Sequence, residues 1–106
     1  MTKQIRKHLG TLEYLYKLDD EERKEQLKDL KGDPLKFLFN ILLNVVYKKV
    51  SVSNEVKLAL HPHKNIIQEL IKKHKSMKSR KAELIKNDNF KILFGILLPE
   101  LRKIAL

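Results

Sequence analysis

The sequence predicts an all-α fold, and two observations lead to that prediction. Only three glycines and three prolines occur among 106 residues, whereas sandwiches and barrels need many turn residues. Apolar residues recur at steps of three to four through most of the chain, as on one face of a helix. We therefore expect a small single-domain bundle of five to seven short helices around a central apolar helix.

Residues 1–33 are expected to form two N-terminal helices. The first, about 2–18, is amphipathic, and Asp19–Asp20 then offers an N-cap for a second, acidic helix. We expect that helix to run to Lys31, to end at Gly32, and to pack loosely because it has few apolar residues. The apolar positions of the first helix are Ile5, Leu9, Leu12, Leu15 (or Tyr16) and Leu18.

The basic region of the same domain, residues 34–106, follows the clearest helix start in the chain. Asp33 is expected to cap a helix with Pro34 at its first position, where the missing N–H costs nothing. This helix, to about Lys49, is apolar on nearly all sides, which predicts burial in the domain or at a subunit interface. Its polar residues form one stripe at four-residue steps: Lys36, Asn40, Asn44 and Lys48.

Three short helices and one long apolar helix are expected after this point. Ser53 and Ser76 are natural N-caps, and another helix begins near Pro62 because the residue before proline avoids helical backbone. The Asn-Asp-Asn sequence at 87–89 predicts a turn that tolerates left-handed backbone. We favour core packing for the apolar residues 90–106, with membrane-interface or homo-oligomer contacts as the alternatives.

The positive charge is concentrated in the C-terminal two-thirds. The chain has 23 Lys and Arg against 13 Asp and Glu, a formal net charge of +10. Residues 1–18 carry +3, residues 19–33 carry −3, and residues 34–106 carry +10. Such an uncompensated excess on a short chain indicates a polyanionic partner, either nucleic acid or an anionic membrane.

The densest positive charge lies between residues 61 and 86. This stretch has eight basic residues and only two acidic ones, Glu69 and Glu83, which gives a net charge of +6. Lysine is a flexible point charge, and lysine-rich, arginine-poor surfaces contact phosphates more than they read bases. A solvated polar face is the alternative interpretation. We expect non-sequence-specific nucleic-acid binding, with double-stranded DNA as partner. The expected contacts are Lys64, Lys72, Lys73, Lys75, Lys78, Arg80, Lys81 and Lys86.

We expect no enzyme, cofactor or metal site. The chain has no cysteine, which excludes disulfides, thiolate zinc sites and cysteine nucleophiles. The serines fit caps and turns, and no P-loop or nucleophile-elbow motif occurs. His61, His63 and His74 lack the four converging ligands of a zinc site. The charged N-terminus predicts no secretory signal, and no segment reaches the ~20 apolar residues of a membrane span.

The order of residues from Leu42 onward follows a known layout. A leucine–asparagine pair in an apolar helix precedes a valine–serine connection, a leucine near a basic pair, an apolar helix ending in lysines, a serine-capped basic run and an apolar tail. In this sequence these are Leu43–Asn44, Val50–Ser53, Leu60 with His63 and Lys64, Ile67 and Leu70 with Lys72 and Lys73, Ser76 through Ile85, and Phe90 through Pro99. The layout resembles that of short basic proteins of Polinton/Maverick and adintovirus-like elements, which are similar to the condensing core protein X of adenoviruses.

The resemblance implies a virion core component that neutralises packaged double-stranded DNA, located in the virion or the host nucleus. The family has a glycine pair where this chain has Asp88–Asn89, and the resemblance supplies no catalytic residue. Two other functions stay open from the residues themselves. One is a protein-interaction module that is dimeric or docks to an acidic partner such as a capsid protein, and the other is a membrane-active protein acting through residues 90–106.

Overall fold

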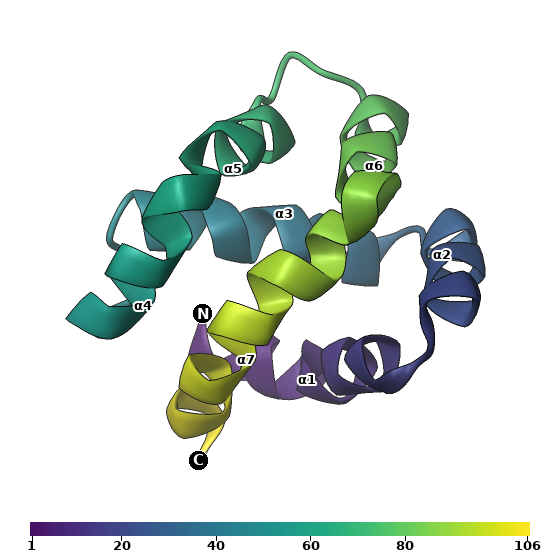
Figure 1. Ribbon diagram of the computed structural model, residues 1–106. Coiled ribbons are helices and arrows are strands. Elements are labelled where there is room, and N and C mark those ends of the chain that lie inside the picture. The colour runs from purple at the N-terminus through teal and green to yellow at the C-terminus, as the bar shows by residue number, and fades with distance from the viewer.

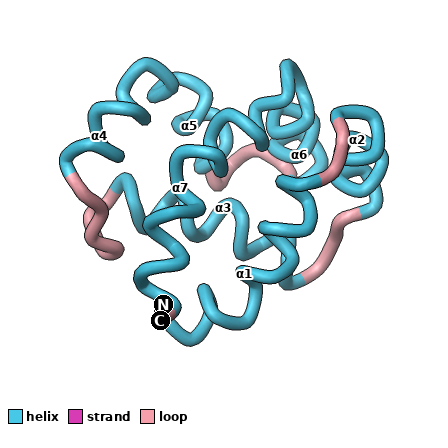
Figure 2. Tube along the Cα trace, turned by 60° about the horizontal axis from the view of Figure 1, so that its bottom comes forward, coloured by secondary structure: helices cyan, strands magenta, loops and turns pink.

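The computed structural model describes residues 1–106, which form helices and no strands (Figures 1 and 2). In chain order the helices are α1 (Thr2–Lys17), α2 (Asp20–Asp29), α3 (Asp33–Val46), α4 (Asn54–Leu60), η1 (His61–His63), α5 (Lys64–Ile71), α6 (Met77–Ile85), η2 (Lys86–Asp88) and α7 (Asn89–Ala105). The two η elements are single 3₁₀ turns. The prediction of an all-α fold with five to seven short α-helices is therefore confirmed.

A single apolar core of 22 buried residues draws on all seven α-helices. Helices α3 and α7 contribute six core residues each, and α3 lies behind α7 in Figure 1. Every core residue of α7 is at most 1% exposed, so the expectation that the C-terminal segment closes the core is confirmed. None of the helices has the length and apolar character needed to cross a membrane.

Helices α1 and α7 pack against each other and place both chain termini on the same side of the bundle (Figures 1 and 2). Near the termini, Arg6 donates a hydrogen bond from Nε to the backbone oxygen of Ala105 at 2.9 Å. Farther along, a Cβ atom on Gly95 would lie only 3.1 Å from Oη of Tyr16. The missing side chain of Gly95 therefore lets α1 pack closely against α7.

Local capping decides several helix ends as predicted. Three side chains accept a hydrogen bond from the backbone N–H three residues later, as N-caps do: Asp19 from Glu22 at 2.9 Å, Ser53 from Val56 at 3.3 Å and Ser76 from Ser79 at 3.0 Å. Asn87 and Asp88 adopt positive φ angles of 53° and 54°, so the predicted left-handed turn is confirmed as well.

The connection from α2 to α3 differs from the prediction. Helix α2 ends at Asp29 instead of Lys31, and Gly32, with φ of 70°, is the N-cap position of α3. The expectations that Gly32 ends α2 and that Asp33 caps α3 are therefore wrong. The physical reason is that glycine adopts positive φ without a steric cost. The chain therefore turns into α3 at Gly32, and Asp33 is already the first helical residue.

Helix α3 is buried at its start and exposed at its end. It stops at Val46, before the expected Lys49, and Lys48 has a positive φ of 59°. The side chains of Val46 and Tyr47 are left 42% and 64% exposed. The last turn of this apolar helix therefore reaches the surface.

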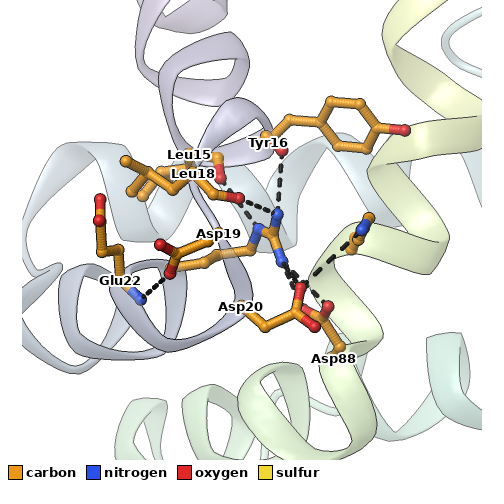
Figure 3. Close-up of polar contacts among 9 residues, drawn as sticks. Leu15, Tyr16, Leu18, Asp19, Asp20, Glu22 and Asp88 are labelled. Atoms are coloured by element: carbon orange, nitrogen blue, oxygen red, sulfur yellow. Dashed lines mark hydrogen bonds and ion pairs between the residues drawn. The ribbon is translucent and has the colours of Figure 1, made fainter.

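A buried arginine holds α2, which was expected to pack loosely. Arg23 is only 1% exposed and donates hydrogen bonds to the backbone oxygens of Leu15 and Tyr16, both at 3.0 Å, and of Leu18. It also contacts the carboxylate of Asp88 at 2.9 Å (Figure 3). These contacts join the end of α1 and the residues before α7 to α2, so the expectation of loose packing is wrong.

Asp20 is the second carboxylate on this guanidinium, with Nη1 and Oδ1 3.0 Å apart. The hydrogen bond from Arg23 and the nearby charge of Lys91 lower the pKa of Asp20. Two carboxylates and three backbone carbonyl oxygens thus accept hydrogen bonds from the guanidinium of Arg23. A buried cation requires such a partner for each of its donors.

Replacing Arg23 with Met is expected to lower the free energy of unfolding by about 3 kcal/mol, because the carbonyl and carboxylate partners lose their shared donor. Urea denaturation followed by circular dichroism measures this change. Lys24→Met is the matched control, since Lys24 is an exposed neighbour on the same helix. Equal stability of the two variants would contradict the role given to Arg23.

Candidate nucleic-acid interface

Two of the eight predicted contact residues share one carboxylate. The ammonium groups of Lys72 and Lys75 both donate to Glu69, the former at 2.7 Å. These hydrogen bonds, with the two positive charges, lower the pKa of Glu69 to about 2. Lys72 and Lys75 are part-exposed cations that a phosphate would have to draw away from an internal partner.

Two further residues of the predicted set support the fold. The guanidinium of Arg80 lies 4.7 Å from the ring centroid of Phe39 and donates to the backbone oxygen of Leu70. Lys81 donates to the backbone oxygens of Lys28 at 2.6 Å and Leu30 at 2.9 Å. Lys81 thereby satisfies unpaired carbonyl groups at the end of α2, and both cations link α6 to its neighbours.

The side chains of the other four predicted residues are exposed and make no hydrogen bond or ion pair, but they do not all share one surface. Lys64 begins α5, Lys73 lies in the turn after α5, and Lys78 lies in the first turn of α6. Lys86 lines a hollow beside the acidic side chains of α2 and Asp88. The fold therefore separates Lys86 from the rest of the predicted interface.

A continuous groove runs between α3 and the segment from α4 to α6. It consists of three adjoining hollows: Leu43, Ile71 and Lys73 line both the first and the second, and Val46 and Gln68 line both the second and the third. We call it the basic groove, and no Asp or Glu lines it. Its cationic residues are Lys36, Lys49, Lys57, Lys64, Lys72, Lys73 and Arg80, together with His61.

Three cations of the basic groove were missing from the predicted set. Lys36, Lys49 and Lys57 lie outside residues 61–86 and reach the groove only through the tertiary arrangement, in which α3 packs against α5 and α4 borders the same hollow. For Lys36 the sequence held a signal, since it belongs to the polar stripe of α3. No local pattern pointed to Lys49 or Lys57.

The histidines occupy separate places. His8 is buried in α1 and stacks on Phe37 with ring centroids 4.7 Å apart, and its burial lowers its pKa. His61 and His63 belong to η1, and His74 lies in the turn after α5. No group of three His, Asp or Glu side chains is placed so that it could hold a metal ion.

Comparison with protein-family models, with curated proteins and with solved structures finds no significant match to this chain.

Glu69 is expected to make stability depend on pH in the acid range. Because its folded pKa of about 2 lies below the ordinary value of 4.5, its contribution is complete above pH 4.5 and is lost as the pH falls toward 2. Urea denaturation at several pH values should show a smaller loss over this range for Glu69→Gln than for the wild type. Glu55→Gln is the control, because Glu55 makes no ion pair, and it should retain the full loss.

Proposed function

We propose that the protein binds nucleic acid without sequence specificity, through phosphate contacts with the basic groove and with the exposed Lys78 of α6. The observation that carries this proposal is the gathering of seven Lys and Arg side chains along a groove whose lining includes no Asp or Glu, five of them without an internal partner. A groove lined mostly by cations concentrates the electrostatic field along a surface and attracts polyanions. Their contacts with phosphates release counterions, which supplies the affinity.

The lack of sequence specificity follows from where the arginines lie. Arg6 bonds the C-terminal carbonyl groups, Arg23 and Arg80 support the fold, and Arg102 pairs with Glu13. Bidentate recognition of guanine is mainly the work of arginine, and all four arginines have internal partners. The unpaired cations along the groove are lysines, which suit phosphate contact.

The proposed biological setting is a core or DNA-packaging component of a virus-like element. It rests on the resemblance to Polinton and adintovirus-like proteins, whereas the proposed phosphate binding rests on the basic groove. Non-specific binding of double-stranded DNA fits this setting, because packaging requires neutralisation of phosphates on any sequence.

Replacing Lys57, Lys64 and Lys73 together with Gln is expected to weaken binding to every duplex sequence equally. The slope of log affinity against log salt should become shallower by ~0.9 for each phosphate contact that is lost. Fluorescence anisotropy with two unrelated duplexes measures both effects. Gln at Lys3, Lys17 and Lys31 is the matched control: it removes the same charge from exposed, unpaired lysines outside the groove. Equal weakening by both triple variants would contradict the proposed interface.

Replacing Glu69 with Gln is expected to raise the affinity for duplex DNA, because Lys72 and Lys75 lose their internal partner. The salt dependence should steepen by up to about two phosphate contacts. Glu83→Gln changes the net charge equally but releases no lysine, since Glu83 makes no ion pair, so it should have the smaller effect in the same titration. A larger effect of Glu83→Gln would argue against a role for the two released lysines.

A further inference from the structure

The floor of the basic groove is apolar. Its middle hollow, of about 820 Å³, combines Leu43, Val46, Tyr47 and Ile71 with Lys49, Lys72, Lys73 and Gln68. Val46 and Tyr47 are among the few large apolar side chains that the fold leaves exposed, at 42% and 64%. The basic groove thus offers apolar area and positive charge side by side.

Phosphate binding uses the positive charge of this groove and leaves its apolar floor unused. A duplex presents a charged backbone that cannot cover aliphatic side chains. Single-stranded bases stack on aromatic rings, but Tyr47 is the one aromatic residue of the middle hollow, and Leu43, Val46 and Ile71 form the rest of its apolar floor. Aliphatic side chains of a protein partner would bury this floor, with a gain of about 25 cal/mol for each Å² removed from water.

We propose that the basic groove docks an acidic amphipathic helix of a partner protein. Apolar side chains at helical spacing would pack on Val46, Tyr47 and their neighbours, as in other helix-in-groove complexes. Flanking Asp and Glu residues would face Lys36, Lys49 and Lys73, which make no internal ion pair. The part of α3 that borders the groove, residues 36–46, is about 15 Å long, so it matches about three turns of the docked helix.

A second copy of this chain does not supply such a helix. Helix α2 is the acidic helix of the protein, and its apolar Leu27 is only 1% exposed. Its remaining surface is polar and charged, and its mean hydropathy is accordingly low. The charge complementarity therefore favours a helix from a different protein, with an apolar stripe that is itself accessible.

This proposal goes beyond nucleic-acid binding and has a consequence for it. Lys64 and Lys73 belong to the basic groove and to the proposed phosphate contacts. A docked acidic helix would cover or neutralise these lysines. The helix and duplex DNA are therefore expected to compete for the protein, so the partner would release or exclude nucleic acid.

The test uses the full chain and a labelled synthetic helix of about 16 residues, with leucines at spacings of three and four and glutamates elsewhere. We expect Val46→Ser combined with Tyr47→Ser to weaken binding of this peptide by about tenfold, through lost apolar contact. Leu58→Ser is the matched control, because Leu58 is 74% exposed on α4 and lies outside the groove. Circular dichroism establishes that the variants fold.

Three results would overturn the proposal. The first is a peptide affinity that responds equally to Leu58→Ser and to the double substitution. The second is equal binding of a scrambled peptide, which has the same charge but no apolar stripe. The third is a loss of oligothymidine binding in the double variant without a loss of peptide binding. This result would show that the apolar floor binds single-stranded bases and not a peptide helix. A failure of duplex binding leaves the peptide result interpretable, so the two proposals are tested separately.

Discussion

The guanidinium of Arg23 fixes how α1, α2 and the residues before α7 are arranged. It joins the carbonyl groups that end α1 to Asp88, which precedes α7, and so sets how α2 closes that side of the bundle. A buried cation tolerates no missing partner, so these three segments have one arrangement. Lys81 then attaches α6 to the end of α2, and Arg80 of the same helix borders the basic groove.

The charges of the protein are sorted by their role in the fold. The arginines are all engaged with internal partners, and Lys72, Lys75 and Lys81 also have them. Seven of the 13 acidic residues lie in residues 19–33, and none of them lines the basic groove, although Asp33 shares a neighbouring hollow with Lys36. Cations such as Lys73 consequently face a surface without carboxylates, next to the exposed end of an apolar helix. The formal charge of +10 is therefore less informative than the location of its unpaired part.

Features that depend on a few consecutive residues could be predicted from the sequence. Ser53 and Ser76 cap their helices, and Asn87 adopts left-handed backbone, because the partner groups lie within three residues or in the same turn. The error at Gly32 has a local cause, since a glycine fits both after one helix and before the next. The burial of Arg23 could not be predicted, because its partner Asp88 is 65 residues away.

The sequence by itself determined the all-α class, the main helix starts and the concentration of positive charge in residues 61–86. These features are predictable because apolar periodicity and capping involve residues within one or two helical turns, and because the charge of a segment follows from its composition alone. Only the tertiary structure decided which cations are unpaired. It places the ammonium group of Lys81 against a backbone oxygen at the end of α2, and it places Lys57 in the lining of the basic groove. An ion pair or a groove requires distances between separate helices, and these are set by packing of the whole core, which no local pattern specifies.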